Sequence, residues 1–257
     1  MIIDIHTHLP VSEKRQAPND SLVLTSLPED MQRCRVDRAV LLPIAPLTPN
    51  EDIRDACRAH PELVGFASVD IHRPDACLAE LAQAVREGGL KGLKLHPRLQ
   101  KMNDSHADLV VELTRLAADL NIPVLMDAFF YGAAGYGLDV LRLIARLSQD
   151  VPQARIIIAH LGGFKVLEAT LMAKENPNLY MDLSFSPLYF EGSSVEQDIA
   201  FAMKKLGPDR LLFGSDFPHM DMAKSIAKVR ELMERVGFND AEQARVMGEN
   251  ARELLGI

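Results

Sequence analysis

The segment MIIDIHTHLP, residues 1–10, leads from an apolar beginning directly into two histidines. Residues 1–3 favour a short buried β-strand. Successive side chains of a strand point to opposite faces, so we expect His6 and His8 to project to one side, together with Asp4. Because neutral imidazole is the commonest metal ligand in proteins, this pair predicts a metal-binding strand end. Taken alone, a His-x-His pair more often consists of one core or surface histidine beside an unrelated one, so the rest of the chain must decide.

Seven further short apolar runs follow the first, and together they indicate the fold. They occupy residues 38–43, 63–70, 90–97, 122–130, 154–162, 178–185 and 210–218. Apolar strands that alternate with amphipathic helices are typical of parallel strands covered by helices. Eight such units predict a closed (β/α)8 TIM barrel, formed as a single domain by residues 1–257. An open doubly wound sheet is the alternative, because periodicity cannot show closure.

The segments between the runs have helical spacing. Residues 75–89 place apolar side chains on one face before Gly88 and Gly89 stop the helix. Residues 106–121 carry a leucine stripe formed by Leu109, Leu113, Leu116 and Leu120. The last segment, 241–256, is expected to form a helix that packs on the outside of the barrel.

Composition and charge restrict the classes of partner. The chain has 257 residues, 47% hydrophobic and 25% charged, which is an ordinary globular composition. A formal net charge of −8 repels a phosphate backbone, so we expect no nucleic-acid partner. No apolar run is long enough to cross a membrane and no signal segment is evident, so we expect no membrane partner. The expected partner is a small-molecule substrate, and the sequence leaves a homodimer open.

Cysteine usage bears on the compartment. Cys34, Cys57 and Cys77 are odd in number and have no CxxC spacing, which favours neither a disulfide framework nor a zinc knuckle. A reducing cytoplasm fits this usage best.

Polar residues end five of the eight apolar runs. They are His6 and His8 in the first run, Lys94 and His96 in the fourth, Asp127 in the fifth, His160 in the sixth and Asp216 in the eighth. In a TIM barrel the chemistry gathers at the carboxyl ends of the strands. Two imidazoles with one or two carboxylates make an open nitrogen and oxygen site that suits Zn²⁺, with Mn²⁺ or Mg²⁺ as alternatives. Because cysteine ligands are absent, the site is expected to be catalytic.

These motifs, taken in order, resemble those of the amidohydrolase superfamily. IHTH and FGSDFP match its His-x-His on strand one and its aspartate on strand eight. GLKLHP, IIIAHLGG, LLFGSDFPH and MGENARELLGI are similar to the amidohydrolase-2 group, which includes the aminocarboxymuconate-semialdehyde decarboxylase type. The resemblance runs from Ile3 to Gly256 and implies a metal-bearing (β/α)8 barrel.

Residue roles carry over from this resemblance. It implies that His6, His8 and Asp216 bind one divalent metal ion, and that His160 activates the metal-bound water or transfers a proton. Lys94 and His96 match a strand-four motif that contacts the substrate or supports the site.

One position departs from the pattern of the resembled family. The family usually has a metal-binding histidine at the end of strand five, where this chain has Asp127. Asp127 can ligate through oxygen and would complete a site of two histidines and two carboxylates. Three other arrangements stay open: Asp127 forms a salt bridge with Lys94 or a histidine, His96 supplies the missing imidazole, or a carboxylated Lys94 bridges two metals.

The predicted reaction is metal-assisted hydrolysis of a small carboxylic ester, lactone or amide. A bound divalent ion lowers the pKa of its water, and Asp216 or His160 then takes the proton as general base. Arg98 is a candidate fork for a substrate carboxylate, or simply an exposed loop arginine. Two alternatives remain: metal-dependent decarboxylation, in which Asp216 or His160 delivers a proton to carbon, and a metal-poor, non-catalytic binding protein on the same fold.

Other residues near the rim have two interpretations each. Some aromatic side chains could line a pocket for a flat or apolar substrate, or belong to the core: Phe129, Phe130, Tyr131 and Tyr189. His72 and His219 either reach the pocket or are solvent-exposed loop residues. His60 and His106 are expected at the surface or at helix caps. Residues 131–137 form a mobile loop or a tight turn. Residues 10–21 carry no readable specificity code.

Overall fold

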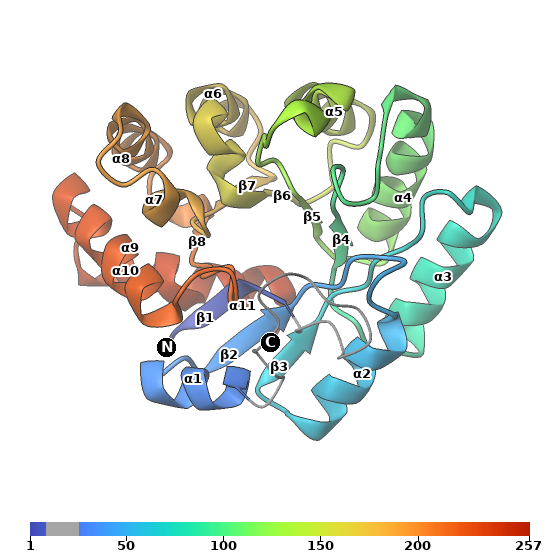
Figure 1. Cartoon of the computed structure of the whole chain (residues 1–257), viewed down its shortest axis with the longest axis horizontal. Helices are drawn as coiled ribbons and strands as arrows, with labels where there is room; N and C mark the ends of the chain where they lie inside the picture. The colour runs from blue at the N-terminus through green and yellow to red at the C-terminus, as the bar shows by residue number, and fades with distance from the viewer. Residues whose placement is uncertain (9–25) are drawn as a thin grey trace.

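The computed structural model describes residues 1–8 and 26–257, so segment 10–21 lies outside the described residues. Within this part of the chain, eight parallel strands form an inner ring that is surrounded by helices (Figure 1). The strands are β1 (Ile3–Thr7), β2 (Arg38–Leu41), β3 (Leu63–Gly65), β4 (Leu93–Leu95), β5 (Val124–Met126), β6 (Ile156–Ile158), β7 (Leu179–Asp182) and β8 (Leu211–Leu212). Each lies within a predicted apolar run, whose remaining residues turn into the loops.

Two junctions close the ring of strands. Strands β1 to β3 pair in order, and so do β4 to β8. Between β3 and β4, the Lys94 amide donates to the carbonyl of Ala67 at 2.7 Å. Between β8 and β1, the Ile5 amide donates to the carbonyl of Phe213 at 2.9 Å. The prediction of a closed barrel is therefore confirmed, and the open sheet is excluded.

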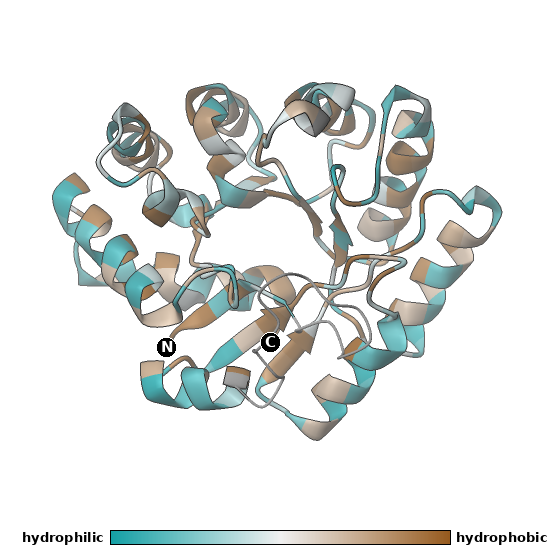
Figure 2. Ribbon diagram, in the orientation of Figure 1, coloured by the Kyte–Doolittle hydropathy of each residue, from teal (hydrophilic) through white to brown (hydrophobic). Residues whose placement is uncertain are grey.

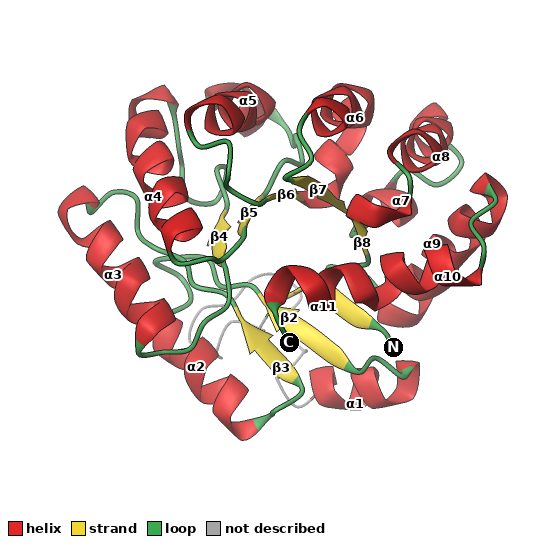
Figure 3. Cartoon of the chain, turned by 180° about the vertical axis from the view of Figure 1, so that it is seen from behind, coloured by secondary structure: helices red, strands yellow, loops and turns green. Residues whose placement is uncertain are grey.

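Helices follow the strands and cover the outside of the barrel (Figure 3). They are α1 (Ser26–Cys34), α2 (Asn50–Ala59), α3 (Pro74–Arg86), α4 (Ala107–Asp119), α5 (Val140–Asp150), α6 (Val166–Glu175), α7 (Ser186–Tyr189), α8 (Ser194–Leu206), α9 (Met222–Val236), α10 (Asp240–Ala244) and α11 (Asn250–Leu255). Among the described residues, no helix has the length and apolar character needed to cross a membrane.

Helices α3 and α4 confirm the two helical predictions. Leu81 of α3 and Leu113 of α4 are fully buried, and the other residues of the leucine stripe pack against the same core. Helix α3 begins with Pro74 in its first turn and ends just before Gly88 and Gly89. Gly89 has a φ of +73°, a conformation that side chains with a Cβ rarely adopt, which explains why the helix stops there.

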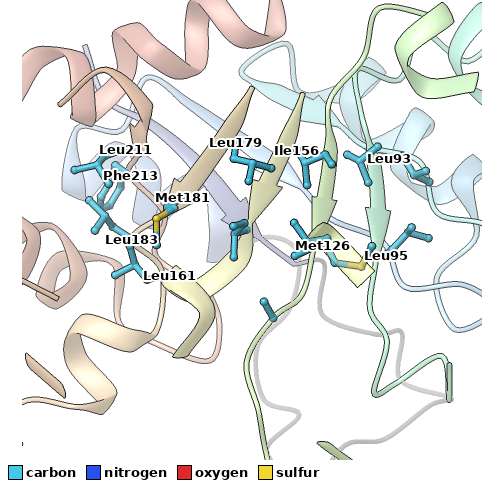
Figure 4. Close-up of a cluster of buried hydrophobic side chains, with 14 of the residues drawn as sticks. Leu93, Leu95, Met126, Ile156, Leu161, Leu179, Met181, Leu183, Leu211 and Phe213 are labelled. Carbon is cyan, nitrogen blue, oxygen red and sulfur yellow. The ribbon is translucent and has the colours of Figure 1, made fainter. Parts of the chain in front are cut away.

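Alternation along the strands divides the core into an outer and an inner layer. Leu93 and Leu95 of β4 point outward to the helices, in the cluster shown in Figure 4, while Lys94 between them points into the barrel. The inner layer includes Ile5 and Phe66. Hydrophobic residues accordingly line the strands and the inward faces of the helices, whereas the outward helix faces are hydrophilic (Figure 2). Polar side chains inside the barrel are thus held on rigid strands.

The C-terminal segment lies outside the ring of strands, as predicted, and covers one end of it. Helix α10 continues through a π-helical turn, Arg245–Glu249, into α11. Leu254 and Leu255 of α11 join the inner core layer. Asn250 Nδ2 donates to the carbonyl of Leu211, where β8 begins. The helix therefore seals the amino end of the barrel, opposite the end that carries the polar residues.

Candidate metal and active site

Strand β1 places two consecutive side chains inside the barrel. Its pairing with β2 shifts register between Asp4 and Thr7. Ile5 packs in the inner core layer, and the next residue, His6, contacts side chains of β4 and β7. A β-bulge of this kind breaks strict alternation and re-aims a side chain, which explains how His6 enters the centre of the site.

The same irregularity corrects the expectation for Asp4. Asp4 Oδ1 accepts the backbone amides of His6 at 3.1 Å and Ser215 at 2.9 Å, so this carboxylate does not join the imidazoles. Burial raises the pKa of Asp4 to about 7. Asp4 therefore supports the backbone of β1 and β8 beside the site.

Three donor atoms converge at the carboxyl end of the barrel. Asp216 Oδ1 lies 3.3 Å from Nε2 of His8 and 3.5 Å from Nε2 of His6. Ligand atoms around a tetrahedral zinc ion, each bound at about 2.0–2.1 Å, are roughly 3.3 Å apart. The predicted set His6, His8 and Asp216 is therefore brought together in a group that could hold one ion.

Hydrogen bonds at Nδ1 of both histidines leave their Nε2 atoms available as metal ligands. His6 Nδ1 donates to Asp182 Oδ2 and His8 Nδ1 donates to the carbonyl of Leu42, both at 2.9 Å. Each imidazole, when neutral, then presents the lone pair of Nε2 to the site. Burial and the charge of Lys94 lower the pKa of His6 to about 4. For Asp216, burial raises the carboxyl pKa, but the hydrogen bond from His8 and the charge of His6 outweigh it, and the pKa falls below its ordinary value. The group thus has the deprotonated ligands that metal binding needs.

Asp127 lies against two other histidines. Its Oδ2 is 3.0 Å from His160 Nε2 and 3.5 Å from His96 Nε2. Burial lowers the pKa of His96 to about 3. For Asp127, burial raises the pKa, but the charge of His96 and the hydrogen bond from His160 bring it well below its usual range. The structure thus leaves Asp127 outside the group of His6, His8 and Asp216 and in the salt-bridge arrangement that the sequence left open; a direct role as ligand stays a prediction.

His160 is held between a carboxylate and a hydroxyl group. Its Nε2 faces Asp127, and its Nδ1 is 2.8 Å from Ser184 Oγ. Burial lowers the pKa of His160, but the hydrogen bond to Asp127 and the charge of that residue outweigh it and raise the pKa to about 9. His160 has a φ of +56°, which turns its ring from β6 toward the other site residues.

Strand β7 ends in a site residue, Asp182, that sequence reasoning missed. Asp182 Oδ1 accepts the backbone amide of His160 at 3.1 Å, and its second oxygen holds His6. Asp182, His6 and His160 form a second group of side chains with metal-binding character. The sequence did contain a sign of this residue. In NLYMDLSF, Asp182 follows the apolar residues of the strand, as Asp127 and Asp216 do in their runs.

Lys94 and Arg98 occupy different levels of the site. Lys94 is fully buried, with Nζ 3.4 Å from His6 Nε2, and burial lowers its pKa. Arg98 is exposed, and its guanidinium carbon lies 5.6 Å from the centre of the Tyr131 ring. Lys94 therefore belongs to the floor of the site, whereas Arg98 stands at its rim.

The other predicted rim residues separate into site neighbours and surface groups. Phe129 packs edge-on against His160, with ring centres 5.9 Å apart, and the His219 ring lies 5.9 Å from that of His8. His72 bonds instead to a backbone carbonyl, and His106 closes a capping box before α4. Three aromatic rings extend the wall that begins at Phe129: Tyr131, Phe185 and Tyr189.

A family model describes the chain almost completely. The model of the family described as "Amidohydrolase" matches residues 3–257. The chain belongs to the amidohydrolase family. Among curated proteins, no match was found.

Solved structures share this amidohydrolase barrel at low sequence identity. An uncharacterised TIM-barrel protein from Bordetella bronchiseptica is 20% identical, with a TM-score of 0.79 over 99% of this chain and 98% of its own. A probable 2-pyrone-4,6-dicarboxylic acid hydrolase from Acinetobacter baumannii is 18% identical, with a TM-score of 0.73 over 100% and 99%. A 5-carboxyvanillate decarboxylase from Novosphingobium aromaticivorans, complexed with manganese and a nitrobenzoic acid, is 16% identical, with a TM-score of 0.76 over 100% and 96%. At such identities the likeness shows the fold alone.

Proposed function

We propose that the protein is a metal-dependent hydrolase of a small carboxylic ester, lactone or amide. The observation that carries the proposal is the convergence of His6 Nε2, His8 Nε2 and Asp216 Oδ1 at the carboxyl end of the barrel. A divalent ion bound there, zinc foremost and manganese or magnesium as alternatives, would supply a polarised substrate carbonyl and a water of lowered pKa.

The surrounding residues supply binding and proton transfer. Asp216, which is ionised, takes the proton of the attacking water as general base. His160 holds a proton that it can donate to the leaving oxygen or nitrogen, and Asp127 keeps its ring in place. Lys94, with His96 beside it, contacts the reacting carbonyl group from the floor, and Arg98 binds a substrate carboxylate at the rim. The aromatic wall beside His160 favours a flat substrate.

Decarboxylation is the second candidate, and the placement of His160 favours it. Both ring nitrogens of His160 face acceptors, which stabilises the protonated imidazolium form. An imidazolium at this position holds a proton that it can transfer to carbon. In that reaction the bond from carbon to the carboxylate breaks, CO2 leaves, and the electron pair left on carbon takes the proton from His160. The manganese-bound neighbour is a decarboxylase by its description, which supports a test of this chemistry.

One experiment in D2O separates the two chemistries. Zinc-loaded or manganese-loaded protein is incubated with small lactones and esters and with aromatic carboxylic acids. Hydrolysis adds the elements of water across one bond, whereas decarboxylation releases CO2 and places one deuterium on carbon, which mass spectrometry detects.

His160→Asn should lower kcat by roughly 100- to 10,000-fold while zinc is retained. His60→Asn, a half-buried histidine beside Glu62 at the end of α2, is the control. Metal-loaded protein that binds these compounds without converting any would instead indicate the non-catalytic binding protein.

A further inference from the structure

A buried serine hydroxyl lies between the two imidazoles that the proposed reaction uses differently. Ser184 Oγ is 2.8 Å from His160 Nδ1 and 3.2 Å from His6 Nδ1. Ser184 is fully buried. Among the described residues, no other side-chain hydroxyl bonds to two histidine rings. We propose that Ser184 is a positioning residue that holds the rings of His6 and His160 in one arrangement.

The direction of the hydrogen bonds follows from the number of protons. Ser184 Oγ also bonds to Asp182 Oδ1. A carboxylate can only accept, so the single hydroxyl proton is donated to Asp182. The lone pairs of Ser184 must then accept, which requires His160 Nδ1 to carry its hydrogen. His6 Nδ1 donates to the other oxygen of Asp182. One serine and one aspartate thus orient both rings.

This arrangement has a consequence for each histidine. With Nδ1 of His6 bound to Asp182 and Ser184, Nε2 is the nitrogen that points to the proposed metal. With Nδ1 of His160 bound to Ser184, Nε2 is the nitrogen that faces Asp127 and the reacting groups. Groups that orient metal ligands in this way typically change metal affinity 10- to 100-fold when they are removed. Ser184 therefore couples the metal side of the site to its proton-transfer side.

The variants must allow for the tight packing around this serine. A Cβ built on Gly214 of the β8 loop would lie 3.0 Å from the Cβ atoms of both Ser184 and His6, so these three residues pack closely and the variants must add little volume. Ser184→Ala removes the hydroxyl, and Ser184→Cys keeps nearly the same size with a weak donor and acceptor. Ser186→Ala is the matched control, because Ser186 is equally buried but donates to the backbone carbonyl of His160.

The readouts are independent of turnover. Long-range ¹H–¹⁵N spectra of the zinc-free protein report the hydrogen-bonded nitrogen of each imidazole, and His6→Gln and His160→Gln assign the two rings. Calorimetric titration with Zn²⁺ alone reports affinity. We expect Ser184→Ala and Ser184→Cys to shift the Nδ1 signals of both rings and to weaken zinc binding 10- to 100-fold, and Ser186→Ala to stay within about twofold of wild type.

Two results need separate interpretation. If Ser184→Ala does not fold, the folded Ser184→Cys variant decides, and unchanged Nδ1 signals in that variant overturn the inference. The inference rests on the proposed function only in taking His6 as a metal ligand. If wild type binds no zinc, the proposed function fails, whereas the imidazole spectra still support or overturn the role of Ser184.

Discussion

His8 Nε2 lies 3.3 Å from Asp216 Oδ1, so the first and last strands of the barrel meet at one pair of candidate ligand atoms. The contact is reinforced by the backbone, since the Asp216 amide donates to the carbonyl of His6 at 2.8 Å. The same contacts between the first and last strands therefore close the barrel and bring the candidate metal ligands together.

Metal content is the first prediction. Protein purified without chelator should carry about one equivalent of zinc or manganese, because the three donors have the spacing of a single mononuclear site. His6→Ala should lose it, since one of three protein ligands is removed. Asp127→Ala should retain most of it if Asp127 only orients His160, and should lose it if Asp127 is a ligand. Elemental analysis of the three proteins measures this, and a metal-free wild type that takes up no added metal would contradict the proposed mechanism.

Gly214→Ala should weaken zinc binding without changing any ligand. The added methyl would lie 3.0 Å from the Cβ of His6 and must displace it by a few tenths of an ångström. Because metal sites tolerate little misplacement, we expect an increase in Kd of roughly tenfold. Gly137→Ala, where a Cβ has no neighbour within 4 Å, is the control. Equal zinc affinity in both variants would show that the β8 loop adjusts freely.

Arg98→Ala should raise KM for a substrate that carries a second carboxylate. A charge-assisted hydrogen bond contributes about 2 kcal/mol, which corresponds to a KM increase of roughly 30-fold, with kcat nearly unchanged because Arg98 lies at the rim. Steady-state kinetics on such a substrate and on its methyl ester measure the effect, and the ester should show little change. The exposed Arg58 of α2 supplies the control Arg58→Ala. A fall in kcat without a change in KM would place Arg98 in the chemical step.

Lys228 should stabilise the fold in a pH-dependent manner. Its buried ammonium lies 2.8 Å from Glu196 Oε1 and 3.0 Å from Glu191 Oε1, linking α9 to α8 and to the segment before it. The hydrogen bond from Lys228 lowers the pKa of Glu196 below its ordinary value of 4.5. A carboxyl with a lowered pKa stabilises the protein above that value, and the stabilisation is lost as pH falls through the lowered pKa.

Lys228→Met should therefore lower the free energy of unfolding by roughly 1 kcal/mol at pH 7, because Glu196 is left with only the more distant Arg235 guanidinium as a cationic partner. The difference from wild type should shrink as pH falls below 4.5. Urea unfolding at several pH values measures it. Lys224→Met, at an exposed position on the same helix, is the control. A constant difference across the pH range would mean that packing, rather than charge, accounts for the loss.

Local patterns in the sequence were sufficient to predict the strands and several site residues. Short apolar runs indicate where a buried strand ends, so His160 and Asp216 were found from the ends of their runs. The same reasoning could have found Asp182, which ends β7 in the same way. Ser184 had no such signal, because a serine after a strand is common and its role depends on two rings from other strands.

The sequence by itself determined the eight parallel strands, the helices between them and the rim that carries the polar residues, because these follow from periodicities within short segments. Only the tertiary structure decided which rim residues meet. The bulge in β1 turned His6 inward and removed Asp4 from the group. The pairing of β5 with β6, together with the positive φ of His160, placed Asp127 against His160. Such distances depend on hydrogen-bond register between strands and on packing across the barrel. These are non-local interactions that no single segment encodes.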